Sequence, residues 1–205
     1  VSAPVRGDAK VLPPPFVRPT PLWYGRPVRP PIDTARLMRF LEELGKRSRS
    51  DGTLYLTGGA TALLHGWRSS TVDVDIKLHP EPQGAFEAIA RLKNELDVNV
   101  ELASPDLFLP ELADWRENSP VVGRFGRVEV HHYDLRAQAL SKIARGHERD
   151  RLDVEAMLAR GLVTRRALRE AFESMRPRLV RYPRIDAERL ADRVLRWTSG
   201  EGEAP

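Results

Sequence analysis

Residues 56–78 constrain the fold of this chain more than any other stretch of its sequence. Thr53–Thr57 has the pattern of a short buried strand, and Gly58-Gly59 ends it. Ala60–His65 has the composition of a helix that begins directly after the glycines. Val72–Leu78 alternates apolar with charged residues, as a strand with one polar face does. Strands joined by such short connections predict a mixed sheet rather than a wholly parallel one.

Helix and strand patterns alternate on both sides of this stretch. Asp33 is suited to cap a helix that runs to about Ser48, and residues 83–96 and 98–102 read as a helix and a strand. This order predicts an α/β (α+β) fold with a small mixed sheet flanked by helices and followed by a helical layer. The remaining expected elements are a long surface excursion over 103–120, a hairpin over 123–133 and helices over 135–145, 148–160, 164–175 and 186–198.

The first 32 residues differ in composition from the rest of the chain. They contain nine of the seventeen prolines and show no helical or strand period, which predicts an extended arm of polyproline II character. They also carry the whole net charge of +4, because residues 33–205 hold equal numbers of basic and acidic side chains. We therefore expect a basic arm over 1–32, a core over 33–134 and a helical C-terminal region over 135–205.

Composition limits the chemistry and the location of the protein. The chain has no cysteine, which excludes disulfides, thiolate metal sites and thiol nucleophiles and leaves oxygen and nitrogen ligands. No stretch approaches the roughly 20 apolar residues of a membrane helix, and the N-terminal residues lack the apolar core of a secretory signal. We expect a cytoplasmic protein with no membrane partner.

Two aspartates on the alternating strand are the first candidates for a functional site. Asp73 and Asp75 are separated by one residue, so their side chains point to the same face, with Cα atoms about 6.6 Å apart. Two carboxylates in such a position require cations or solvent. Their spacing indicates a shared site for Mg²⁺ or Mn²⁺ ions.

The glycine pair before this strand indicates an anion site. Without a Cβ, Gly58 and Gly59 allow a phosphate to approach the main-chain N–H groups at the start of a helix. Polar residues around them add hydroxyl groups and one cation: Thr57, Thr61, Arg68, Ser69, Ser70 and Thr71. A phosphate-binding turn beside a metal site is typical of a protein that binds a nucleoside triphosphate.

The order of these motifs resembles the DNA polymerase β-like nucleotidyltransferase superfamily. Gly58-Gly59, Arg68-x-x-Thr71 and Asp73-x-Asp75 follow one another as its members' motifs do, over about residues 33–102. The resemblance implies a third acid on a later strand, for which we expect Glu101. Glu129 and then Asp134 are the alternatives. It also implies a nucleotidyltransferase fold.

A narrower resemblance extends to the helical region. The motifs look like those of the nucleotidyltransferase-like toxins of type IV toxin–antitoxin systems, the abortive-infection group, and their bacterial relatives. The resemblance implies that Lys142 contacts the triphosphate and that Asp150 or Asp153, in an Arg-Asp-x-x-Asp segment, is its partner. Ala60 departs from the pattern, because a hydroxyl residue often follows the glycines there.

The expected activity is metal-dependent transfer of a nucleoside monophosphate from an NTP to an acceptor hydroxyl. The acceptor implied by the resemblance is an RNA (tRNA) 3′ end, and a protein or small-molecule hydroxyl remains open. Four arginines within 176–184 are the best candidates for an RNA-binding surface. The alternative function is a non-catalytic binding module in a pair with an antitoxin protein.

Overall fold

The computed structural model describes residues 29–199, so the predicted arm lies outside the described residues up to residue 28. The last residue of the expected arm packs in the folded core. Ile32 is fully buried, and its backbone pairs with Thr71. In chain order the elements are α1 (Thr34–Arg47), β1 (Gly52–Thr57), α2 (Gly58–Leu64), β2 (Asp73–Leu78), α3 (Ala85–Glu95), β3 (Asn99–Leu102), η1 (Pro105–Leu107), β4 (Val121–Phe125), β5 (Val128–His132), α4 (Leu135–Arg145), α5 (Glu148–Ala159), α6 (Arg165–Met175), η2 (Arg176–Arg181) and α7 (Ala187–Thr198).

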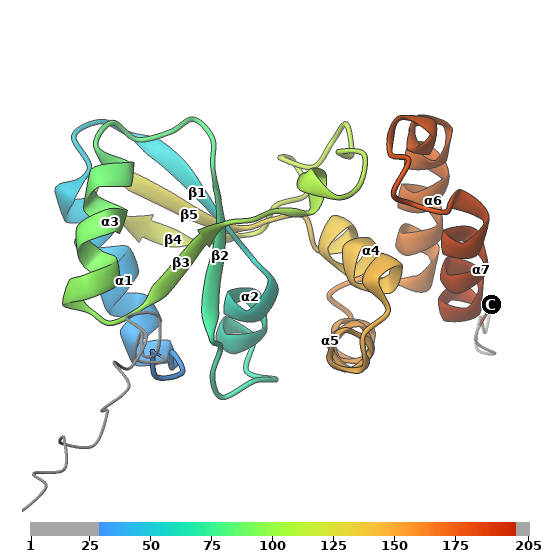
Figure 1. The fold of residues 1–205 in the computed structure, drawn as a ribbon, viewed down its shortest axis with the longest axis horizontal. Coiled ribbons are helices and arrows are strands. Elements are labelled where there is room, and N and C mark those ends of the chain that lie inside the picture. Colours follow the sequence, from blue (N-terminus) through green and yellow to red (C-terminus); the bar gives the residue numbers. More distant parts are fainter. Residues whose placement is uncertain (1–28, 200–205) are drawn as a thin grey trace, which may run out of the picture.

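The strands within residues 29–199 form one sheet in the order β3-β2-β1-β5-β4 (Figure 1). β1 runs antiparallel to β2 and parallel to β5, whereas β2 and β3 are parallel. The sheet is therefore mixed, and the expected α/β class is confirmed. The expected hairpin is also confirmed, since β4 and β5 pair antiparallel.

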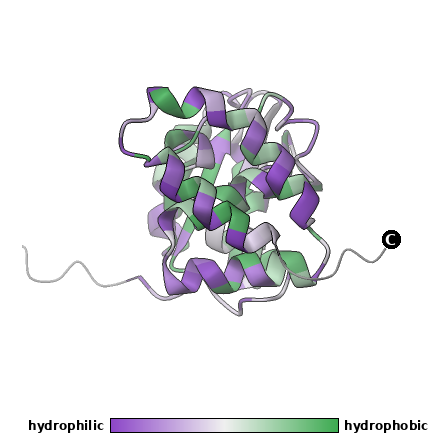
Figure 2. Cartoon of the chain, turned by 90° about the vertical axis from the view of Figure 1, so that its right-hand side faces the viewer, coloured by the Kyte–Doolittle hydropathy of each residue, from purple (hydrophilic) through white to green (hydrophobic). Residues whose placement is uncertain are grey.

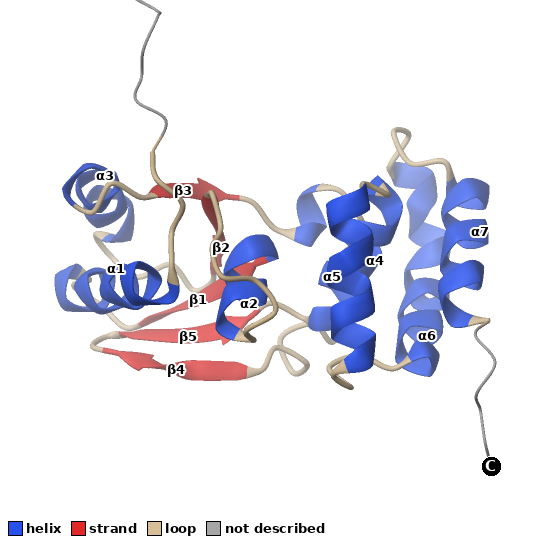
Figure 3. Ribbon diagram, turned by 90° about the horizontal axis from the view of Figure 1, so that it is seen from below, coloured by secondary structure: helices blue, strands red, loops and turns tan. Residues whose placement is uncertain are grey.

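One face of the sheet is covered by α1 and α3 (Figure 3). The alternation of the strands places their apolar residues on this face, where Leu56, Val74 and Val100 pack with Phe40 of α1 and Leu92 of α3. Asp33 begins α1 as expected, because its side chain accepts a hydrogen bond from the backbone N–H of Arg36. The polar residues of the strands are consequently left on the opposite face.

Residues 103–120 are not the surface excursion that the sequence suggested. Leu109, Leu112 and Trp115 are almost completely buried. The Trp115 ring lies 4.7 Å from the ring of Tyr55 on β1 and 4.6 Å from that of Tyr133, centroid to centroid. This segment therefore covers part of the polar face and joins the sheet to the helical layer.

Helices α4 to α7 form the C-terminal layer beside the sheet (Figure 1). The four helices expected after residue 134 are confirmed within a residue or two of their predicted ends. Their buried residues pack on one another, and the face of the layer turned away from the sheet carries many hydrophilic residues (Figure 2). No helix in residues 29–199 has the length and apolar character needed to cross a membrane.

Candidate functional site

Asp73 and Asp75 lie on the uncovered part of the polar face of β2, and both are half-buried. The parallel pairing of β2 with β3 sets Asp73 opposite Asn99 and Asp75 opposite Glu101. Because directly paired residues have Cβ atoms roughly 5 Å apart, Glu101 is the nearest carboxylate along β3 to Asp75. The two aspartates and Glu101 thus share one face at one end of the sheet.

The glycine pair lies directly against these aspartates. Gly58 has a φ of +58°, and a Cβ added there would lie 2.7 Å from Oδ2 of Asp75. A Cβ at Gly59 would lie 2.0 Å from Oγ1 of Thr71. Both positions need glycine, the first for its backbone conformation as well as for space. The absence of side chains brings the turn into contact with the Asp75 carboxylate and with the start of β2.

A cleft opens between this turn and α4. Asp75 and Gly58 form one wall, and Lys142 and Arg145 of α4 form the other. The pKa of the Asp75 carboxyl is raised from 3.8 to about 6, chiefly by burial and then by the negative charges of Asp73 and Glu101, while Arg145 and Lys142 act in the opposite direction. The cleft therefore holds the Asp75 carboxylate together with two cations, and Asp73 and Glu101 lie beside Asp75 on the same sheet face.

A buried ion-pair network holds the cationic wall in place. Lys142 is 4% exposed, and its Nζ lies 2.5 Å from Asp153 Oδ2 and 3.3 Å from Asp150 Oδ1. Asp153 also accepts from Arg68, with Nε at 2.9 Å, and Asp150 accepts from Arg145. Burial alone raises the pKa of Asp150, but hydrogen bonds and charges from Arg145 and Lys142 outweigh it, so the pKa is lowered. The network links the loop after α2 to α4 and α5.

Comparison of the chain with protein-family models, with curated proteins and with solved structures gave no match. Its function is therefore argued from the chemistry of this cleft.

The carboxylates suit a hard divalent cation in kind, because Mg²⁺ and Mn²⁺ prefer oxygen ligands. Their side chains are not gathered into a ligand group: within residues 29–199 no three His, Asp or Glu side chains are placed to hold a metal ion. The Asn99 amide separates two of the acids, since Nδ2 lies 2.6 Å from Asp73 Oδ1 and 3.0 Å from Glu101 Oε1. Each of these hydrogen bonds occupies one carboxylate oxygen and leaves the second oxygen of Asp73 and of Glu101 for other partners.

Several hydroxyl groups expected at a phosphate are occupied within the protein. Thr61 is fully buried and donates to the backbone oxygen of Leu56, which corrects its expected role in nucleotide binding. The hydroxyl of Thr57 donates to the backbone oxygen of Ala103, and that of Thr71 to Asp73 O. These hydroxyl groups stabilise the turn, because each donates to a backbone oxygen of the protein. Ser69 and Ser70 are exposed in the loop after α2, and Arg68 is engaged by Asp153.

Three residues of the site were not predicted from the sequence. Arg145 was not among the candidates from the sequence, yet it lines the cleft with Asp75. Gln138 accepts from the N–H of Gly58 at 2.9 Å, so this N–H is already paired. Asn99 bridges two acids. The only available signal was the position of Asn99 two residues before Glu101 on an alternating strand, because the others depend on how α4 packs.

The alternative acids lie elsewhere. Glu129 pairs with Thr53, four residues or about 13 Å along β1 from the Thr57 that faces Asp75. Its carboxylate lies 3.4 Å from His131 Nε2. Asp134 is fully buried and caps α4. Neither lines the cleft.

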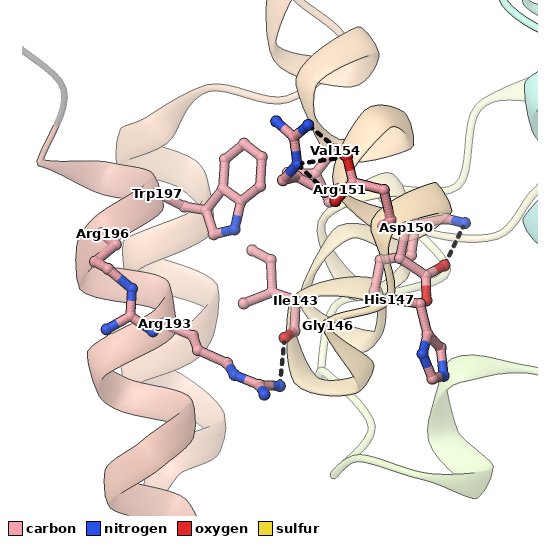
Figure 4. Close-up of a pocket in the computed structure, with 11 residues that line it drawn as sticks. Ile143, Gly146, His147, Asp150, Arg151, Val154, Arg193, Arg196 and Trp197 are labelled. Carbon is pink, nitrogen blue, oxygen red and sulfur yellow. Dashed lines mark hydrogen bonds and ion pairs between the residues drawn. The ribbon is translucent and has the colours of Figure 1, made fainter.

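A second cavity lies on the other side of Lys142, between the α4–α5 turn and α7 (Figure 4). Trp197, Arg193 and Arg196 border it on α7, and Arg193 donates to the backbone oxygen of Ile143 at 3.2 Å. Lys142 and Asp150 line it as well, so the ion-pair network forms a partition between the two spaces. None of Asp73, Asp75 and Glu101 lines this cavity.

The raised pKa of Asp75 predicts a pH-dependent cost to stability. A carboxyl that ionises near pH 6 when folded and near 3.8 when unfolded costs the folded state up to about 2–3 kcal/mol at neutral pH, at about 1.4 kcal/mol per pKa unit. Stability is thus lost as pH rises from about 4 to 6. Asp75→Asn should stabilise the protein at pH 8 and change it little at pH 4, as measured by urea unfolding.

Asp192→Asn supplies the control, because Asp192 is exposed on α7 and no ion pair or hydrogen bond of its side chain occurs within residues 29–199. An equal effect of Asp75→Asn at both pH values would contradict the assigned cause.

Proposed function

We propose that the protein is a metal-dependent nucleotidyltransferase that moves a nucleoside monophosphate from an NTP to an acceptor hydroxyl. The observation that carries the proposal is the placement of Asp73, Asp75 and Glu101 on one sheet face, against the glycine turn and opposite Lys142 and Arg145. Asp75, Lys142 and Arg145 line one cleft, so a carboxylate that suits a cation and two cations that suit a phosphate chain lie in the same space. A metal-bound triphosphate carries both a cation for the carboxylates and negative charge for Lys142 and Arg145, which supports nucleotidyl transfer as the function of the cleft.

Asp73, Asp75 and Glu101 would hold the divalent cation, which neutralises phosphate oxygens and lowers the pKa of the acceptor hydroxyl. Lys142 and Arg145 line the same cleft and bind the phosphate chain through their positive charges. Asp150 and Asp153 fix the Lys142 ammonium so that its position is set before the substrate arrives. Most of the rate enhancement then comes from positioning and charge neutralisation.

The transfer is a single displacement. The acceptor oxygen forms a bond to the α-phosphorus of the NTP while the bond from that phosphorus to the oxygen bridging to the β-phosphate breaks. Pyrophosphate leaves with the bonding electron pair, and the proton of the hydroxyl passes to solvent water. Lys142 and Arg145 offset the charge that develops on the leaving pyrophosphate.

Arginines beside the cleft support an anionic acceptor, with RNA favoured over a small molecule. Arg145 is shared by the cleft and by a hollow that is also lined by Arg184, Arg189 and Arg193. Within residues 29–199, Arg184 and Arg189 have no acidic side chain within ion-pair distance. Of the four arginines expected to bind RNA, Arg184 lines this hollow, and Arg176 pairs with Glu173 and Glu188.

Isothermal titration tests the metal and nucleotide dependence. Each NTP should bind the wild-type protein in Mg²⁺ or Mn²⁺, and chelation of the metal should abolish the binding. The double variant Asp73→Asn/Asp75→Asn should not bind in either condition. Equal binding with and without metal would remove the basis of the proposal.

The third acid is tested by a matched pair of variants. Glu101→Gln is expected to lower transfer by about 10²-fold or more without unfolding the protein, because it removes a charge next to Asp75. Glu129→Gln should change transfer less than about threefold, since its carboxylate faces His131 far from the cleft. Initial rates of pyrophosphate release provide the measurement. The reverse ranking would transfer the role to Glu129.

A further inference from the structure

The lining of the cleft beside Asp75 is of two chemical kinds. Lys142 and Arg145 of α4 supply positive charge. Ala103, Pro105 and Phe108 supply an apolar lining from the segment that follows β3. A nucleotide has the same polarity, with a charged phosphate chain and a flat, weakly polar base.

The side chain of Phe108 is exposed to solvent. It is 49% exposed, although Leu109 and Leu112 that follow it are each 1% exposed. The backbone N–H groups of Phe108 and Leu109 both donate to the backbone oxygen of Pro105, at 3.0 Å and 2.9 Å. The exposure of the ring therefore comes from its direction and not from a loose segment.

Lys77 fixes the same segment to the sheet on both sides of Phe108. Its Nζ lies 2.7 Å from Asp106 Oδ2 and 2.9 Å from Glu111 Oε1. Lys77 is on the same strand face as Asp73 and Asp75, two residues further along β2. The strand that presents the acids thus also holds the segment that presents the ring, and the relative position of acids and ring is set before any ligand binds.

We propose that Phe108 is the stacking surface for the nucleobase of the NTP. The inference rests on the proposed function and adds the binding position of the base. A base stacked on the ring lies in the same cleft as Lys142 and Arg145, which then bind its phosphates. Loss of one base–aromatic stack weakens binding by about 5- to 150-fold.

The test compares two probes by isothermal titration in Mg²⁺: ATP, and inorganic tripolyphosphate, which has the phosphates but no base. Phe108→Ala should weaken ATP binding by about 5- to 150-fold and change tripolyphosphate binding less than about twofold. Phe108→Trp should keep ATP binding. Phe108→Leu retains an apolar side chain without an aromatic face, so it should weaken ATP binding as Phe108→Ala does. It also keeps the test valid if Phe108→Ala does not fold. Leu107→Ala is the control, because Leu107 is 60% exposed beside Phe108 and does not line the cleft.

Equal weakening of both probes by Phe108→Leu, or weakening of neither, would overturn the stacking position and leave the proposed function standing. Failure of the wild-type protein to bind either probe would overturn the proposed function and the inference with it.

Discussion

Asp75→Asn is expected to lower the rate of nucleotidyl transfer by about 10³-fold or more while the protein remains folded. Of the three acids, Asp75 is the one that lines the cleft and lies against the glycine turn, so it is the central ligand in the proposed site. Asparagine keeps the shape of the side chain but removes the charge that would hold the cation and, through it, the phosphates. The rate of pyrophosphate release, with circular dichroism to verify the fold, measures the effect.

The same substitution should stabilise the protein at neutral pH, because the ionised Asp75 carboxylate opposes folding. Loss of activity together with a gain of stability is the signature of a residue retained for function. Asp192→Asn on α7 should change neither quantity. Activity within tenfold of wild type in Asp75→Asn would contradict the assigned role.

Asp153→Ala is expected to destabilise the protein by about 3–5 kcal/mol, because it leaves the buried Lys142 ammonium without its shortest ion pair. The substitution also removes the acceptor of Arg68 and of the Trp67 indole N–H, which lies 3.0 Å from Asp153 Oδ1. Asp153 is 1% exposed, so bulk solvent does not reach these contacts in the folded protein. The change in free energy of unfolding is measured by urea denaturation.

Glu155→Ala is the matched control on the same helix. Glu155 forms an exposed ion pair with Arg151 at helical spacing, and such pairs contribute about 1 kcal/mol or less. A loss of stability in Asp153→Ala no greater than that in Glu155→Ala would show that the network does not hold the cationic wall.

Local patterns were sufficient to predict most of the fold. The period of two on β2 predicted that Asp73 and Asp75 share a face, and helix periodicity predicted α4 to α7. Residues 103–120 were misinterpreted because prolines interrupt any period there. Leu109, Leu112 and Trp115 become buried only when the segment meets Tyr55 and the helical layer.

The cleft was only partly predictable for a similar reason. The family resemblance implied Asp150 or Asp153 as the partner of Lys142, and the structure pairs the lysine with both acids. The entry of Arg145 into the cleft and the contact of Gln138 with Gly58 depend on the packing of α4 about 80 residues beyond the glycine turn. Thr61 was misassigned because the glycine pair does not reveal which side of α2 faces inward.

Parallel labelling with α-³²P and γ-³²P nucleotides shows whether the protein transfers a nucleoside monophosphate. The protein is incubated with Mg²⁺, each NTP, total bacterial RNA and a cell lysate, beside the Asp73→Asn/Asp75→Asn variant. The wild-type protein should place the α label in RNA and release the γ label as pyrophosphate, and the variant should label nothing. α label in protein alone would move the acceptor and retain the chemistry. Transfer of the γ label instead, or no label in any fraction with any metal or nucleotide, would contradict the account.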